Sequence, residues 1–222
     1  MFRTFFVALL SFTTLATALP AHADYFVWQD PKTGASLTFP DTWRTINNQK
    51  PDDLVTLIGP SQSDYPICRL RARGDNRFTV YPIWYSGDVQ DVAYNRDFWD
   101  NYTGEYDDVQ ITGYDDDAGI GKAWASMIEA NFTSATPKDP EHQRTGLMWA
   151  GVYHDDAFIL DCSATSGSFR KWEPDFVGIA HSVDMRKVIH ENVNGNYRPF
   201  VPGDEFNRPV MNGNDKMGRT VN

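Results

Sequence analysis

The stretch GLMWAGVYHDDAFILDCSATSGSFRKWEPDFVGIAHSVDM, residues 146–185, decides the fold. Two apolar runs flank a polar corner at 154–156, and an amphipathic segment follows the second run. The first run, 147–153, is apolar on both faces, which is typical of a central strand covered above and below. From Phe169 the apolar residues recur at steps of three and four, which predicts a helix over 168–183. The stretch therefore predicts a hairpin with a helix laid back on its sheet.

Other short apolar runs, bounded by Gly, Pro and Asp turns, predict further strands. These runs are 25–28, 35–39, 54–58, 67–71, 77–85, 109–114 and 122–132. Between them, apolar residues at helical spacing predict a second helix over 88–106. We therefore expect one α+β domain over residues 24–186, an antiparallel β-sheet flanked by helices. Beyond it, residues 187–222 are rich in Asn, Gly and Pro, which predicts a flexible polar C-terminal tail.

The first 23 residues have the pattern of a secretory signal peptide. Arg3 is the only charge before Asp24, an apolar stretch runs over 5–19, and Ala21-His22-Ala23 forms a cleavage site. An uncleaved membrane anchor is the alternative, but polar residues and a proline interrupt the apolar stretch. We expect cleavage after Ala23, no stable membrane anchor afterwards, and a periplasmic or secreted protein.

Charge narrows the choice of partners. The chain of 222 residues has 20 basic and 30 acidic residues, a net charge of −10. Cleavage removes one basic residue, so the mature chain has 19 against 30, or −11. Such an acidic surface repels phosphate backbones and anionic lipids, which argues against nucleic acid or membrane-surface partners.

The chain contains two cysteines, Cys68 and Cys162, and both lie in the exported part. In an oxidising compartment an even count predicts a Cys68–Cys162 disulfide, with two free thiols as the alternative. The bond would close a loop of 94 residues, for which chain entropy alone gives roughly 4 to 5 kcal/mol. We expect the reduced protein to remain folded and to melt at a lower temperature.

Three patterns resemble functional sites, and each also has a structural explanation. Alternation places Arg69, Arg71 and Arg73 on one face of a strand; we interpret them as a solvated face that balances nearby acids, with an anion or carboxylate site as the alternative. The acids at 115–117 lack calcium-loop spacing and indicate a solvated turn. The His-Asp-Asp corner at 154–156 has no nucleophile elbow to serve and indicates a hairpin turn.

The histidines show no zinc-ligand spacing, and the Gly-Ile-Gly-Lys segment lacks the rest of a phosphate loop. The sequence thus assigns no catalytic, cofactor-binding or metal-binding residue, and we expect no cofactor. Its predicted site residues are the disulfide pair alone.

Two motifs resemble PsbP-like proteins. The first is Thr33-Gly34-Ala35-Ser36-Leu37-Thr38-Phe39-Pro40-Asp41-Thr42-Trp43, and the second joins Phe158-Ile159-Leu160-Asp161-Cys162-Ser163-Ala164 to Phe169, Pro174, Phe176, Ile179 and Ser182. The resemblance covers about 25–185 and implies an α/β/α sandwich. Members of that family mostly act as binding or assembly factors, such as the photosystem II extrinsic subunit and Ran-binding Mog-type proteins. The family supplies no catalytic motif, and this chain departs from it in its long polar tail.

We therefore expect a non-enzymatic exported protein, a monomer, that binds a protein partner or supports envelope assembly. The alternative is a secreted hydrolase or small-ligand-binding protein with an aromatic-lined cleft. Its cleft would be lined by tryptophans: Trp43, Trp84, Trp99, Trp124, Trp149 and Trp172.

Overall fold

The computed structural model of the chain describes residues 24–46, 50–77, 86–134, 142–153 and 155–185. The expected signal peptide, the expected tail and nearly all of the expected strand at 77–85 lie outside these ranges. Among the described helices, none combines the length and the apolar character that a membrane span requires.

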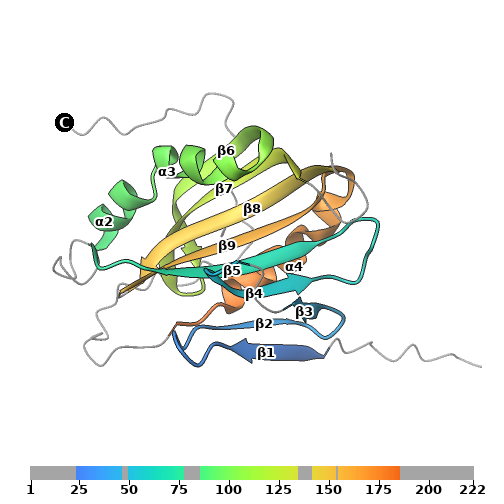
Figure 1. Cartoon of the computed structure of the whole chain (residues 1–222), viewed down its shortest axis with the longest axis horizontal. Helices are drawn as coiled ribbons and strands as arrows, with labels where there is room; N and C mark the ends of the chain where they lie inside the picture. The colour runs from blue at the N-terminus through green and yellow to red at the C-terminus, as the bar shows by residue number, and fades with distance from the viewer. Residues whose placement is uncertain (1–23, 47–49, 78–85, 135–141, 154, 186–222) are drawn as a thin grey trace, which may run out of the picture.

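Seven antiparallel strands form the main sheet (Figure 1). They are β3 (Arg44–Ile46), β4 (Asp53–Ile58), β5 (Ile67–Gly74), β6 (Asp107–Ile120), β7 (Ala123–Ser134), β8 (His142–Tyr153) and β9 (Asp156–Thr165). Their order is β3-β4-β5-β9-β8-β7-β6, so β8 and β9 lie inside the sheet. The pair Tyr153 and Asp156 closes their hairpin, which confirms a turn at the predicted polar corner.

Helices cover both faces of this sheet (Figure 1). One face carries α2 (Ser86–Ala93), α3 (Arg96–Tyr102) and the short η2 (Thr103–Glu105); the other carries α4 (Phe169–Ser182), entered through η3 (Ser166–Ser168). The predicted helix at 88–106 is thus divided. Asn95 begins α3 by accepting a hydrogen bond from the Phe98 backbone N–H at 3.1 Å, as a helix N-cap does.

The α4 face is an apolar core. A second, two-stranded sheet, β1 (Tyr25–Gln29) with β2 (Ser36–Pro40), packs beside α4. The Ser182 hydroxyl fixes this hairpin by bonding both the backbone N–H and the carbonyl of Thr38. Trp43 is 3 % exposed and lies edge-on to Trp172 and Phe176 within this core. The antiparallel sheet between two helical layers confirms the predicted fold class.

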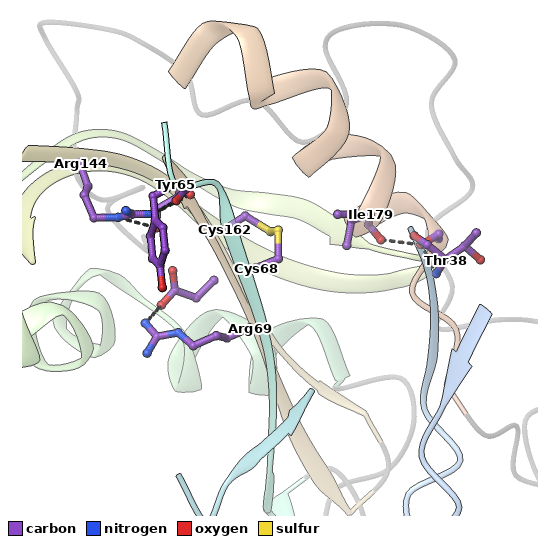
Figure 2. The surroundings of a disulfide bond; sticks show 10 residues. Thr38, Tyr65, Cys68, Arg69, Arg144, Cys162 and Ile179 are labelled. Atoms are coloured by element: carbon purple, nitrogen blue, oxygen red, sulfur yellow. Dashed lines mark hydrogen bonds and ion pairs between the residues drawn. A yellow bond between two sulfur atoms is a disulfide. The ribbon is translucent and has the colours of Figure 1, made fainter. Parts of the chain in front are cut away.

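The disulfide joins neighbouring strands. Cys68 of β5 lies directly opposite Cys162 of β9 in the strand register, and their sulfur atoms are bonded. Both residues are buried in the α4-side core. In Figure 2 the bond lies toward Ile179 of α4, whereas Arg69 and Arg144 extend to the other side of the strands.

The predicted turn at residues 115–117 is wrong. These aspartates lie within β6, which is an edge strand of the sheet, and the pairing with β7 shifts between Asp115 and Ala118. The irregularity turns Asp116 and Asp117 toward solvent. A bulge with charged side chains is a common device that keeps an edge strand from pairing with another chain.

Candidate functional site

The arginines of β5 lie under α3 and η2 rather than in solvent. Alternation does place Arg69, Arg71 and Arg73 on one face, as predicted, and this face is opposite the disulfide. Arg71 is 8 % exposed, and the Arg69 side chain is 18 % exposed. The prediction of a solvated strand face is therefore wrong for these two residues, because a helical layer covers them; Arg73 alone is well exposed.

An aromatic stripe on the helical layer meets these arginines. Tyr94, Phe98, Tyr102 and Tyr106 follow one another at intervals of four residues; Phe98 and Tyr102 lie on α3, Tyr94 lies between α2 and α3, and Tyr106 follows η2. Three guanidinium groups lie over three of these rings, and we call these paired arginines and tyrosines the array. The distances to the ring centroid are 6.0 Å for Arg69 with Tyr106, 5.5 Å for Arg71 with Tyr102 and 5.6 Å for Arg77 with Tyr94.

A buried carboxylate anchors one end of this array. Asp161 of β9 lies opposite Arg69 in the strand register, and its Oδ2 accepts hydrogen bonds from Arg69 Nη2 at 2.7 Å and from the Tyr106 hydroxyl. Burial alone would raise the pKa of Asp161, but the positive charges of Arg69 and Arg71 outweigh burial and lower it. Burial and the neighbouring Asp161 charge raise the pKa of Tyr106. Asp161 is thus an anion that accepts from a neutral phenol and a guanidinium.

Arg71 holds the centre of the array. Its Nε donates to Asp53 at 3.1 Å, and its Nη1 donates to the Tyr102 hydroxyl at 2.9 Å and to Glu105 at 3.0 Å. Glu105 also accepts from Lys50 Nζ at 2.7 Å. Among the described residues, Arg71 Nη2 has no hydrogen-bond partner. These bonds fix both the arginine and the ring of Tyr102 and hold η2 against the sheet.

A groove of about 600 Å³ opens beside this array, between β4–β5 and α3. Its volume lies within the range of ligand pockets. The partly buried Phe98 and Tyr102 and the buried Tyr94 line one side, and Ala157 and Ile159 of β9 contribute apolar surface. Eight of the other lining residues are charged: Lys50, Asp52, Asp53, Arg71, Arg73, Asp75, Arg77 and Glu105. The groove thus combines an aromatic surface with a charged rim.

The tryptophans do not form the cleft expected for the alternative function. Trp43, Trp99, Trp149 and Trp172 are buried core residues, at 3, 0, 0 and 7 % exposed. Trp124 is exposed at 37 % and does not line the groove. Trp84 lies outside the described residues. The prediction of a tryptophan-lined cleft is therefore wrong for the residues that the structure describes.

The described part of the chain holds no group of three or more His, Cys, Asp or Glu side chains close enough to bind a metal ion. A histidine meets a hydroxyl where His142 Nε2 lies 2.7 Å from Thr165 Oγ1. That hydroxyl also bonds the backbone carbonyls of Ser63 and Asp64, so it fixes a loop rather than facing an open cleft. His154 lies outside the described residues.

Sequence reasoning found the arginines and missed their partners. The four-residue spacing of aromatic residues from 94 to 106 was a usable signal, because it predicts one aromatic stripe on the covering helices. No comparable signal marks Asp161. Its pairing with Arg69 joins residues 92 positions apart and depends on the register of β5 with β9.

Comparison with known proteins bears on the fold. No family model matches the chain, and no curated relative matches it. Among solved structures, LpqN of Mycobacterium tuberculosis, described as involved in cell envelope biogenesis, is similar with a TM-score of 0.50 and 14% identity, over 75% of this chain and 92% of LpqN. The PsbP (CyanoP) of Synechocystis sp. PCC 6803 gives a TM-score of 0.49 and 11% identity, over 78% of this chain and 99% of that protein.

At this identity, the similarity to LpqN shows a shared fold and nothing further. The architecture that the PsbP-like resemblance implies, an antiparallel sheet with helices on both faces, is the one found here. The predicted PsbP-like fold is thus confirmed.

Proposed function

We propose that the chain is an exported, non-enzymatic binding protein that holds part of a protein partner in the groove beside α3. The observation that carries this proposal is a groove of ligand size that is lined on one side by the partly buried rings of Phe98 and Tyr102. The similarity of the fold to LpqN, a protein involved in cell envelope biogenesis, supports an envelope role.

The chemistry of the groove favours binding over reaction. Its charged side chains pair with one another: Arg71 with Asp53 and Glu105, Lys50 with Glu105, Arg73 with Asp52, and Arg77 with Asp75. A catalytic acid or base needs a group poised to exchange a proton with a substrate. The hydrogen bond from Arg77 is the main cause of the lowered pKa of Asp75, so this carboxylate is kept ionised. We therefore set the hydrolase alternative second.

The test is capture of a partner that depends on the groove. The mature chain is immobilised and exposed to an envelope extract of the producing cells, together with two groove variants, Phe98→Ala and Asn101→Trp. Asn101 is exposed, so the tryptophan narrows the groove without removing a core contact. Phe26→Ala on β1 is the matched control, because Phe26 is an aromatic residue 57 % exposed far from the groove.

We expect a protein that the wild type and Phe26→Ala capture and both groove variants lose. Capture that is the same for all four chains, or no capture at all, counts against the proposal. Export is checked separately by intact mass: the exported chain should begin at Asp24.

A further inference from the structure

Resting on the proposed function, we propose that the groove recognises an acidic peptide segment that carries an apolar side chain. The argument starts from which charges at the groove reach solvent. The side chains of Lys50, Arg73 and Arg77 are 53, 77 and 51 % exposed. Their carboxylate partners are less exposed: Glu105 at 30 %, Asp52 at 43 % and Asp75 at 10 %. A ligand entering the groove therefore meets the cations first.

The exposed cations also keep donors for a ligand. Arg73 uses Nε and Nη2 on Asp52, and Arg77 uses Nε and Nη2 on Asp75. A guanidinium has five N–H donors, so the Nη1 group of Arg73 takes no part in these bonds, whereas Arg77 also has a side-chain hydrogen bond with Tyr94. Lys50 uses one of its three donors on Glu105. Carboxylates of a partner can accept charge-assisted hydrogen bonds from these remaining donors.

The groove lining pairs four cations with four carboxylates, and on an acidic chain its more exposed cations are a local feature. The exported chain, with 19 basic against 30 acidic residues, repels a polyanion that lies along its surface, which disfavours nucleic acid. Screening confines charge effects to about 8 Å at physiological ionic strength. A short segment with one or two carboxylates therefore gains the local attraction of Arg73 and Arg77 without bringing a large negative charge to the whole surface.

The aromatic wall selects an apolar side chain beside those carboxylates. Phe98 stacks with Tyr102 at 5.9 Å and meets Tyr94 edge-on at 4.8 Å, so the wall is a preformed surface. About half of the residues lining the groove are charged. A long acyl chain would cover those charges without replacing their hydration, which costs free energy. A peptide instead places polar main-chain groups beside them and one apolar side chain on the wall.

The test uses the exported chain, residues 24–222, labelled with ¹⁵N, and three probes. These are the peptide N-acetyl-Glu-Leu-Trp-Glu-amide, its Gln-Leu-Trp-Gln counterpart and sodium decanoate. We expect the acidic peptide to shift amide resonances of Gly74 and Asn101 and to bind about three- to tenfold more tightly than the neutral peptide at low salt, since exposed ion pairs contribute modestly. The preference should shrink as salt is added.

Two charge variants locate the preference. Arg73→Gln should remove most of the preference for the acidic peptide, and its exposed side chain makes this change tolerable for the fold. The matched control is Arg96→Gln on α3, which deletes the same charge from a surface pair with Asp100 outside the groove and should leave the preference unchanged.

Each other outcome overturns the inference. Equal binding of both peptides in the groove removes the preference for acids but leaves groove binding, and with it the proposed function, intact. Groove shifts with decanoate alone assign an acyl anion instead. If none of the probes shifts groove resonances, the acidic-peptide assignment is wrong, whereas the proposed function fails only if the captured partner is insensitive to the groove variants.

Discussion

The two faces of one strand pair differ in how they are held together. On the α4 side, Cys68 and Cys162 lie opposite each other and are joined by a disulfide inside an apolar core. One residue along, the next opposed pair is Arg69 and Asp161, and it faces the α2–α3 side as an ion pair. The same two strands are thus linked covalently on one face and electrostatically on the other.

The two faces of the sheet contribute differently to the stability of the fold. Apolar burial on the α4 face stabilises the fold without further conditions. On the α2–α3 face, burying a charge costs the free energy of its hydration. Only well-placed partners offset this cost, so the buried charges contribute little net stability. What they contribute is a fixed arrangement of arginines and tyrosines beside an open groove. The α2–α3 face also has an apolar cluster of its own around Trp99, Ile128 and Phe132, and its charged part borders the groove for which we propose a partner.

The largest expected effect comes from breaking the ion-pair face. Asp161→Asn leaves Arg69 and Arg71 without the carboxylate whose pKa they lower. Removing one partner of a buried pair typically costs 3 to 5 kcal/mol, and we expect about 4 to 5 kcal/mol here, because Asp161 is buried and Arg69 loses the carboxylate that it bonds. Urea unfolding followed by circular dichroism measures the loss.

A triple variant tests whether the loss of stability comes from leaving a charge unpaired or from losing the ion pair itself. Arg69→Met, Tyr106→Phe and Asp161→Leu together remove every polar partner of the buried carboxylate and should recover most of the loss, as apolar replacement of buried ion pairs does elsewhere. If Asp161→Asn alone costs less than about 1 kcal/mol, the array is solvated and the contrast between the two faces does not hold.

A phenylalanine on each face compares the two cores directly. Phe176 of α4 is fully buried, and Phe176→Ala should cost about 4 kcal/mol, within the range for such truncations. Phe98 on the groove wall is only partly buried, so Phe98→Ala should cost less than half as much while weakening peptide binding. Thermal unfolding and the peptide titration give both readouts. Equal losses of stability would show that Phe98 is a core residue rather than a binding surface.

Removing the disulfide should have a somewhat smaller effect. The closed loop has a sequence separation of 94 residues, and measured losses are commonly 2 to 4 kcal/mol, so we expect about 3 kcal/mol for Cys68→Ala with Cys162→Ala. The variant should remain folded, because the α4-side core around the pair is extensive. Retention of the peptide-binding resonances at the groove checks that the other face is intact. A chain that fails to fold contradicts the assignment of stability to apolar burial.

The sequence predicts one face better than the other, for a physical reason. Alternation and helical spacing report which residues are apolar, and on the α4 face that property alone fixes burial, as for Leu70 and Phe176. Cysteine parity identified Cys68 and Cys162 as a pair. Sequence patterns predict that an arginine such as Arg71 is exposed. Whether a helix covers it depends on packing between segments that are far apart in the sequence. The groove therefore emerges only from the packing of α3 on β5.

The smallest expected effect lies at the rim of the apolar face. Asp64, in the connection between β4 and β5, accepts hydrogen bonds from Lys171 Nζ at 2.9 Å and Trp172 Nε1 at 3.0 Å, which fasten α4. The bond from Lys171, followed by that from Trp172, lowers the pKa of Asp64 from 3.8 to about 2. A lowered pKa means that the carboxylate stabilises the fold fully above about pH 4 and loses this contribution as the pH falls toward 2.

Asp64→Asn should therefore cost about 1 kcal/mol at pH 7, since Lys171 is 64 % exposed and screened by water. The difference in stability between Asp64→Asn and the wild type should disappear near pH 2, because the wild-type carboxylate then loses its charge and the amide of the variant has none at any pH. Urea unfolding at pH 7, 4 and 2.5 measures it, and Lys171→Met separates the ion pair from the Trp172 bond. A loss as large as that of Asp161→Asn would mean that charge, and not apolar burial, also holds the α4 face together.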